Sequence, residues 1–289
     1  MTDINKIVEN IGTLKDVIRI SSFGTFEDGS SYDVWLIECR DARYVLKPFK
    51  NFEPEVYSAF LSRGERYAPR LIAKTNYDGR DYILMEYAEG EAIMRFDRDS
   101  LTKALDALIA FQREYWNTAV NVDVGFNFDK ALVHRTSRGE YLHDAELEAA
   151  YAVFLEQFAS LPRTLCHDDL LPFNVLVSDT GATVVDWELA GILPYPTSIA
   201  RLIAHCEDSD GAFFYMKDSD KSFAVDYYYE NLIRDKGIPY GDFRHSLDLF
   251  VLYEYCEWIM LGNKYADADM DRFEQYTKKA RALIAKMNT

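Results

Sequence analysis

The sequence predicts an α+β fold in two lobes, a β-rich N-lobe with one helix followed by a mainly helical C-lobe. Up to about residue 87, short runs of β-branched and aromatic residues alternate with turn residues, a pattern typical of strands. From about residue 100, apolar residues recur at every third or fourth position, which is the helical period. We therefore expect residues 1–87 to form the first lobe and residues 88–289 the second.

The N-lobe is expected to hold five strands after a short N-terminal helix. A turn at Asp78-Gly79 joins the last two strands, because this dipeptide favours hairpin turns. The helix between the third and fourth strands, at about 53–63, starts near Pro54, and proline is tolerated in the first turn of a helix. The expected strands are 17–20, 34–37, 44–46, 70–74 and 82–86.

The C-lobe is expected to be helical apart from one hairpin. This hairpin joins 173–178 to 182–186 through a turn at 179–181, and after Trp187 the chain has helical periodicity to its end. Ser100 is placed as the cap of the first helix. The expected helices are 101–115, 144–160, 197–207, 219–235, 243–262 and 271–287.

Composition and charge limit the kinds of partner. With 289 residues, of which 48% are hydrophobic, the chain can fill a large core. Its formal net charge is −16 and it has no sustained run of Lys and Arg, which disfavours a nucleic-acid-binding surface. The same charge attracts cationic small molecules. We therefore expect small-molecule partners and no nucleic acid.

Cysteines and apolar segments bear on the cellular compartment. Cys39, Cys166, Cys206 and Cys256 are widely spaced and form neither a zinc motif nor a disulfide framework. The N-terminal residues lack the apolar segment of a signal peptide, and no run of about 18 apolar residues suits a membrane span. The expectation is a cytoplasmic protein that does not bind a membrane.

Three polar side chains lie on or beside the predicted hairpin. Asp169 and Asn174, together with His167, fit the H-x-D-x-x-x-x-N spacing of a kinase catalytic loop, and Asp186 ends the following strand. A loop aspartate can accept a proton from a hydroxyl nucleophile, while an asparagine and a second aspartate hold magnesium against phosphates. The segment therefore predicts phosphoryl transfer.

Upstream residues supply candidates for nucleotide binding. Lys47 ends the third strand, ahead of a helix that carries Glu53 and Glu55, and such a lysine can contact nucleotide phosphates and pair with a glutamate. Helical spacing favours Glu53, since apolar residues three, four and seven positions later share its side, but Glu55 remains open. Ser30, in a loop after Gly24, can cover the phosphates. That loop lacks G-x-G-x-x-G and also fits a plain hairpin connection.

In this order, the motifs resemble the aminoglycoside phosphotransferase/choline kinase-like superfamily over about residues 17–260. The matching segments are Lys47, the run Tyr-Ile-Leu-Met-Glu-Tyr-Ala-Glu-Gly at 82–90, the loop and strand at 167–177, and Val-Val-Asp-Trp-Glu at 184–188. The resemblance implies a two-lobed protein-kinase-like fold.

The resemblance also implies a role for each matching residue. Asp169 would be the catalytic base, and Asn174 and Asp186 would bind Mg²⁺. Lys47 would contact the nucleotide phosphates. Glu188 would give a second metal contact or, alternatively, a salt bridge or a helix start. The adenine site would be lined by three residues, the last two through their backbone groups: Met85, Glu86 and Ala88.

The chain departs from the family motif His-Gly-Asp-Leu-His-Pro-Gly-Asn at three positions. Asp168, Leu171 and Phe173 stand where relatives commonly have Gly, His and Gly. Two adjacent carboxylates can raise one pKa, or Asp168 can point to solvent. Further along, Ser198 stands where relatives often carry an aspartate that braces the loop.

The expected function is Mg²⁺-dependent transfer of the γ-phosphate of ATP or GTP to a hydroxyl of a small molecule. An aminoglycoside-like or amino-alcohol acceptor fits an acidic C-lobe, since carboxylates and aromatic faces bind amines. The alternatives are a non-catalytic nucleotide-binding or assembly member of the same fold and, third, a protein kinase, which would need an Ala-Pro-Glu segment that is absent. Candidate acceptor contacts are Asp208, Glu254, Glu257 and Trp258.

Overall fold

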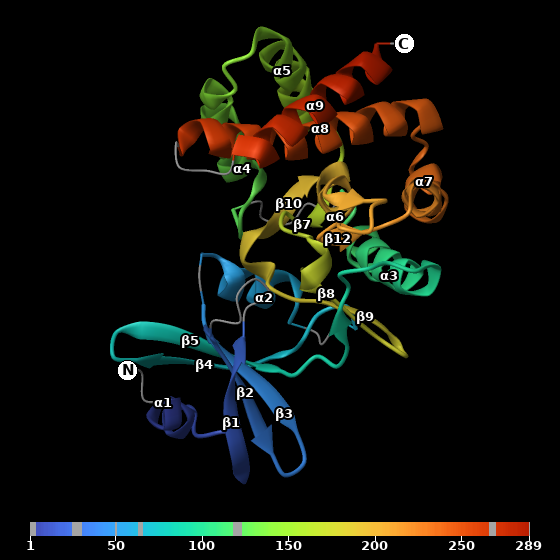
Figure 1. Cartoon of the computed structure of the whole chain (residues 1–289). Coiled ribbons are helices and arrows are strands. Elements are labelled where there is room, and N and C mark those ends of the chain that lie inside the picture. Colours follow the sequence, from blue (N-terminus) through green and yellow to red (C-terminus); the bar gives the residue numbers. More distant parts are fainter. Residues whose placement is uncertain are drawn as a thin grey trace.

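Sheet and helices separate into two lobes along the chain. The computed structural model describes residues 4–24, 31–49, 51–62, 66–117, 123–265 and 270–288. Figure 1 shows a twisted sheet, coloured blue to cyan, at one end of the molecule and a stack of helices at the other. The predicted α+β architecture is confirmed.

The N-lobe is built on one antiparallel sheet. Its elements are α1 (Ile4–Ile11), β1 (Val17–Gly24), β2 (Ser31–Cys39), β3 (Arg43–Pro48), α2 (Glu53–Phe60), β4 (Leu71–Tyr77) and β5 (Arg80–Glu86). In the described residues the strand order is β1-β2-β3-β5-β4, and all five predicted strands are present. Ile7 of α1 packs with Ile37, Leu46 and Leu84 of the sheet, and these residues form the small core of this lobe.

Helices dominate the chain beyond the sheet. Its elements are β6 (Glu91–Ala92), α3 (Arg98–Glu114), α4 (Phe128–Arg138), α5 (Ala145–Ser160), β7 (Arg163–His167), β8 (Val175–Ser178), β9 (Gly181–Val184), β10 (Ala190–Pro194), α6 (Pro196–Ala204), β11 (Cys206–Glu207), β12 (Phe214–Tyr215), α7 (Asp218–Tyr228), α8 (Tyr240–Lys264) and α9 (Met270–Met287). Helices α5, α8 and α9 lie together at the end far from the sheet (Figure 1). Stacked rings fill the space between α5 and α8, with Phe154 and Tyr253 centroids 4.8 Å apart.

The sequence pattern does not predict helix α4 or the C-lobe strands β6, β7, β10, β11 and β12. The buried face of α4 contains Phe128, Ala131 and Arg135. Because one of these three buried residues is charged, the sequence does not show the apolar helical periodicity that would predict this helix. The helical prediction beyond Trp187 is wrong for β10, β11 and β12, and β11 lies within the predicted helix 197–207. Strand β10 pairs with β7 in antiparallel register from Ala190 opposite His167. This apolar run is too short for a stable helix and ends in a proline, which suits a strand edge.

Helix α3 begins before the predicted cap. Asp97 is the N-cap, and its carboxylate accepts the Ser100 N–H at 2.8 Å. Ser100 Oγ in turn accepts the Asp97 N–H at 3.0 Å. This reciprocal pair is a capping box, so Ser100 lies inside the first turn and not at its start.

The connection between the lobes requires a glycine. Gly90 has φ +131°, and a Cβ there would lie 2.7 Å from Val177 O of β8. Only glycine adopts this backbone without strain and allows so close an approach. The chain then forms β6, which pairs with β8, so the segment after the sheet is fixed against the C-lobe hairpin.

The cysteines and helices carry no sign of a disulfide or a membrane span in the part of the chain that is described. All four cysteines are described and are free thiols, three of them buried. None of the helices among these residues has the length and apolarity needed to cross a lipid bilayer.

A buried ion pair ties α4 to the residue after β7. Arg135 Nη2 donates to Asp168 Oδ1 at 2.5 Å, and the Arg135 side chain is 1% exposed. The guanidinium carbon also lies 4.8 and 4.6 Å from the ring centroids of Phe158 and Tyr253. Burial raises the pKa of Asp168, and Arg135 opposes that rise. Asp168 therefore points into the protein and not to solvent.

Removing one member of this pair should cost much of the stability of the fold. We expect Asp168→Ala to lower the free energy of unfolding by about 3–5 kcal/mol, because it leaves the Arg135 charge buried without its partner. Urea unfolding measures this loss. The double variant Asp168→Ala/Arg135→Met should recover most of it, since no charge is then buried. A loss below about 1 kcal/mol for the single variant, the value of an exposed pair, would show that the ion pair is not an anchor.

Candidate active site

Lys47 of β3 lies between two carboxylates. Its Nζ is 2.9 Å from Glu53 Oε1 on α2 and 2.7 Å from Asp186 Oδ1 of the C-lobe. The Glu53 side chain is 1% exposed, whereas that of Asp186 is 43% exposed. Glu55 lies on the exposed side of α2. Of the two predicted partners, Lys47 therefore pairs with Glu53.

Burial and neighbouring charges shift the pKa values of this group. Burial raises the pKa of Glu53 to about 7, while Lys47 opposes the rise. Asp186 and Glu188 add to it, which places Glu188 within electrostatic reach of Glu53. Burial lowers the pKa of Lys47, but the two carboxylates outweigh burial and raise it overall. Lys47 is therefore a permanent cation, and Glu53 titrates near neutral pH.

Asp186 occupies a turn two residues after the end of β9. Its backbone is left-handed, with φ 64° and ψ 57°, a region that aspartate adopts more readily than most residues. The next residue, Trp187, is fully buried and donates its Nε1–H to Val184 O at 2.8 Å. Its ring meets the edge of Phe111, with centroids 5.2 Å apart. The buried indole thus fixes the turn that carries the Asp186 carboxylate.

The loop after β7 is tied to the residue before Asp186. His167 is fully buried and donates its Nε2–H to Val185 O at 3.0 Å, and Val185 N donates to Asn174 O at 2.9 Å. Burial lowers the pKa of His167, so the ring is a neutral organiser of the loop. Ser198 Oγ accepts the His167 N–H at 2.9 Å. Ser198 therefore braces the loop from the position where relatives have an aspartate.

Asp169 is held by two other side chains. Asn174 Nδ2 donates to Asp169 O at 2.8 Å and lies 3.4 Å from Asp169 Oδ2. Arg201 of α6 donates from Nη2 and Nε to Asp169 Oδ1 at 2.8 and 3.2 Å. The Asp169 side chain is 27% exposed. Arg201 is not among the predicted site residues, and its one sequence signal is a single charge within the otherwise apolar run from Ile199 to Ala204.

The predicted metal ligands supply suitable oxygen atoms. Asn174 donates from Nδ2 to the Asp169 carbonyl oxygen. Its Oδ1 therefore points away from Asp169 and is the atom that would bind a metal ion. Among the described residues, no three His, Cys, Asp or Glu side chains gather as metal ligands. Mg²⁺, however, is usually held by one or two carboxylates together with substrate phosphates and water. Asn174, Asp186 and Glu188 therefore fit Mg²⁺ that arrives with a nucleotide.

The predicted adenine segment follows β5. Met85 is buried in the sheet, while Glu86 and Ala88 are half-buried. The Glu86 carboxylate accepts from Arg70 Nη2 at 2.6 Å, and Tyr87 N donates to Arg43 O at 3.0 Å. The Glu86 N–H donates to Arg70 O at 2.9 Å, so both the carboxylate and the amide of this residue are bonded within the protein.

The predicted acceptor residues of α8 are engaged within the protein. Glu254 Oε2 and Glu257 Oε2 lie 2.7 and 3.3 Å from Arg201 Nη1, and Glu254 is 2% exposed. Trp258 stacks almost parallel to Tyr276 of α9, with centroids 5.7 Å apart. The structure therefore joins Glu254 and Glu257 to Asp169 through Arg201, a connection that sequence spacing does not reveal.

The remaining predicted site residues lie apart from this group or outside the described residues. Asp208 is exposed, and its carboxylate accepts the N–H of Asp218 at the start of α7 at 3.2 Å. Ser30 lies outside the described residues.

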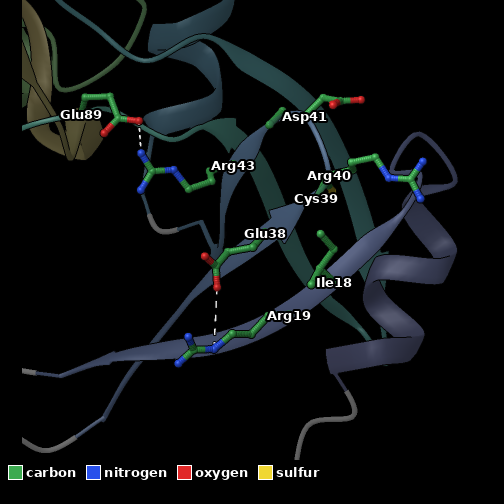
Figure 2. A pocket seen from close by; sticks show the side chains of 9 residues that line it. Ile18, Arg19, Glu38, Cys39, Arg40, Asp41, Arg43 and Glu89 are labelled. Atoms are coloured by element: carbon green, nitrogen blue, oxygen red, sulfur yellow. Dashed lines mark hydrogen bonds and ion pairs between the residues drawn. The ribbon is translucent and has the colours of Figure 1, made fainter.

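A surface hollow of about 550 Å³ in the N-lobe contains none of the predicted site residues. Figure 2 shows two of its arginines pointing at carboxylates, Arg43 at Glu89 and Arg19 at Glu38. Because these cations are already paired, they offer little to a phosphate group. The hollow is therefore separate from the candidate active site.

Solved structures share this fold over the whole chain. An aminoglycoside phosphotransferase from Alicyclobacillus acidocaldarius is 15% identical, with TM-score 0.64, covering 98% of this chain and 95% of that one. A choline kinase from Cryptosporidium parvum is 16% identical, with TM-score 0.60 and coverage of 98% and 97%. The amicoumacin kinase hAmiN, in complex with AMP-PNP, Ca²⁺ and Ami, is 10% identical, with TM-score 0.64 and coverage of 99% and 94%. These likenesses confirm the predicted kinase-like fold.

Sequence comparison identifies the family. No curated protein sequence matches the chain significantly. The model of the phosphotransferase enzyme family (APH) matches residues 23–226, which is well over half of the 289 residues and contains Lys47, Asp169 and Asp186. The chain therefore belongs to the phosphotransferase enzyme family.

Proposed function

We propose that this protein transfers the γ-phosphate of ATP or GTP, with Mg²⁺, to a hydroxyl of a small molecule. The observation that carries the proposal is the position of Lys47, whose ammonium is 2.9 Å from Glu53 and 2.7 Å from Asp186. In kinases, a lysine paired with a helix glutamate and next to a metal-binding aspartate marks a site competent for phosphoryl transfer. The hAmiN structure, which holds AMP-PNP and Ca²⁺, supports a nucleotide and a divalent cation as partners.

The N-lobe, residues 1–87, would bind the nucleotide. Lys47 would contact phosphate oxygens, and its link to Glu53 would keep the ammonium in place. Met85 would line the adenine site, and Glu86 and Ala88 would use backbone groups there. Ser30 would lie over the phosphates.

The loop between β7 and β8 would perform the transfer. Mg²⁺, held by Asn174 and Asp186 with Glu188 beside them, would offset the charge that builds up on the phosphate oxygens. Asp169 would accept the hydrogen bond of the acceptor hydroxyl and take its proton as the new O–P bond forms. In the same step the bond between the γ-phosphorus and the β–γ bridging oxygen breaks, and ADP or GDP leaves. Such reactions depend mainly on positioning and charge. The main way in which the protein would activate the acceptor is therefore the fixed orientation of the Asp169 carboxylate.

An aminoglycoside-like or amino-alcohol acceptor remains our proposal for the second substrate. The known structures of this fold include enzymes named for aminoglycosides, choline and amicoumacin. Glu257 is 16% exposed and is paired with Arg138 and Arg201, so an amine would have to replace one of these partners to reach its carboxylate. Exposed Asp208 would be a second contact. Glu254 and Trp258 are more enclosed, and they would hold the acceptor surface in place through their contacts with Arg201 and Tyr276.

Replacing the proposed base should remove transfer while leaving nucleotide binding in place. We expect Asp169→Ala to lower kcat by about 10²- to 10⁴-fold, the usual contribution of a general base, with little change in the KM of the nucleotide. The assay offers Mg-ATP or Mg-GTP with a panel of aminoglycosides, choline, sugars and amino alcohols. Asp179→Ala, in the exposed turn of the β8–β9 hairpin, is the matched control and should retain wild-type turnover.

The same assay separates the competing functions. Turnover that survives Asp169→Ala unchanged would rule out this residue as the base. Nucleotide binding without turnover on any acceptor would favour the non-catalytic member of the fold, and phosphorylation of a protein substrate alone would favour the protein kinase.

The buried Glu53 should make stability depend on pH in a defined direction. Its pKa is about 7 in the fold against 4.5 for a free glutamate, so the folded state holds the proton more tightly. The stability that Glu53 contributes is therefore complete below about pH 4.5 and is lost as pH rises to about 7. Relative to Glu53→Gln, the free energy of unfolding of the wild type should fall by about 3 kcal/mol across this interval.

Denaturant unfolding at a series of pH values measures the effect of Glu53. Glu55→Gln, on the exposed side of the same helix, is the control and should keep the pH dependence of the wild type. Parallel stability curves for the wild type and Glu53→Gln would show that the Glu53 carboxyl does not titrate in this range.

A further inference from the structure

One carboxylate oxygen of the proposed base, Asp169, accepts hydrogen bonds from Arg201, an arginine outside the catalytic loop. Arg201 directs both Nη2 and Nε at the same oxygen, Asp169 Oδ1, at 2.8 and 3.2 Å. The second oxygen, Oδ2, lies 3.4 Å from Asn174 Nδ2. A carboxylate held by two donors on one oxygen cannot rotate freely, so its other oxygen keeps one direction.

Arg201 is itself fixed by α8. Its Nη1 contacts Glu254 Oε2 at 2.7 Å and Glu257 Oε2 at 3.3 Å, and the Arg201 side chain is 12% exposed. Behind it, His205 Nε2 lies 3.3 Å from Glu254 Oε2. Burial raises the pKa of Glu254, but Arg201 and His205 outweigh burial and lower it overall. The guanidinium is therefore clamped between a buried carboxylate and the proposed base.

We propose that Arg201 is a positioning residue for the transfer reaction, which fixes Asp169 Oδ1 so that Oδ2 faces the acceptor hydroxyl, and that Glu254 anchors Arg201. The inference rests on the proposed function. Because Arg201 contacts the base at Asp169 and the α8 carboxylates of Glu254 and Glu257, we expect it to act on transfer and not on nucleotide binding. A misplaced catalytic group commonly costs about 10²-fold in rate.

The test uses hydrolysis of Mg-ATP, with water in place of the acceptor, and calorimetric binding of Mg-ADP. The main variant is Arg201→Lys, which keeps a positive charge beside Glu254 but lacks the fork that donates twice to one oxygen. We expect hydrolysis to fall by at least about tenfold, while the Kd of Mg-ADP changes by less than about twofold. If Arg201→Lys does not fold, the double variant Arg201→Gln/Glu254→Gln, which removes one charge of each sign, is measured in its place.

A matched control separates contact with the base from a general loss of charge. Arg138 pairs with Glu257 but has no contact with Asp169 among the interactions of the described residues. Arg138→Gln therefore removes a guanidinium from Glu257, one of the two α8 carboxylates that contact Arg201, and should leave hydrolysis within about twofold of wild type.

A double-variant cycle distinguishes positioning from a structural role. If Arg201 acts through Asp169, Arg201→Lys should change hydrolysis by less than about twofold once Asp169→Asn is present, because residues that act as a unit are not additive. An equal loss in both backgrounds, or full hydrolysis by Arg201→Lys alone, overturns the inference and leaves the proposed function intact. A wild type that binds Mg-ADP but neither hydrolyses Mg-ATP nor phosphorylates any acceptor of the panel overturns the proposed function, and the inference with it.

Discussion

The ammonium of Lys47 is the contact on which the arrangement of both lobes depends. It joins Glu53 in the N-lobe to Asp186 in the C-lobe, at 2.9 and 2.7 Å. The contact requires the register in which Lys47 lies opposite Ile83, because a slip of one residue would turn the side chain to the other face of the sheet. It also requires the left-handed turn at Asp186. The Lys47 contacts therefore depend on three features at once: the register of the sheet, the position of helix α2 and the geometry of the turn after β9.

Two of the departures from the family motif, Asp168 and Ser198, are matched by other residues of the same chain. Asp168, which stands where relatives have glycine, is neutralised by the buried Arg135. Ser198, which stands where relatives have an aspartate, still braces the loop through the His167 N–H. Asp168 and Ser198 thus each have a partner that holds the loop in place.

The sequence predicts the parts of this protein that depend on local pattern. The five strands, the β8–β9 hairpin and the order of Lys47, Asp169 and Asp186 all follow from short-range periodicity and spacing. The features that the sequence does not predict involve charged side chains that are buried in the fold. Arg135 hides helix α4, because an arginine lies on its buried face, and Arg201 reaches Asp169 from 32 residues away. Periodicity treats both as surface residues, and only the fold shows which carboxylates they meet.

The central claim is that Asp186, beside Lys47, holds a divalent cation against nucleotide phosphates. The most direct measurement is the affinity for ADP with and without Mg²⁺, by calorimetry, in the wild type and in Asp186→Ala. We predict that Mg²⁺ strengthens ADP binding to the wild type by at least about tenfold, or about 1.4 kcal/mol, and that this gain disappears in Asp186→Ala. An equal gain from Mg²⁺ in both proteins, or none in the wild type, would contradict the account.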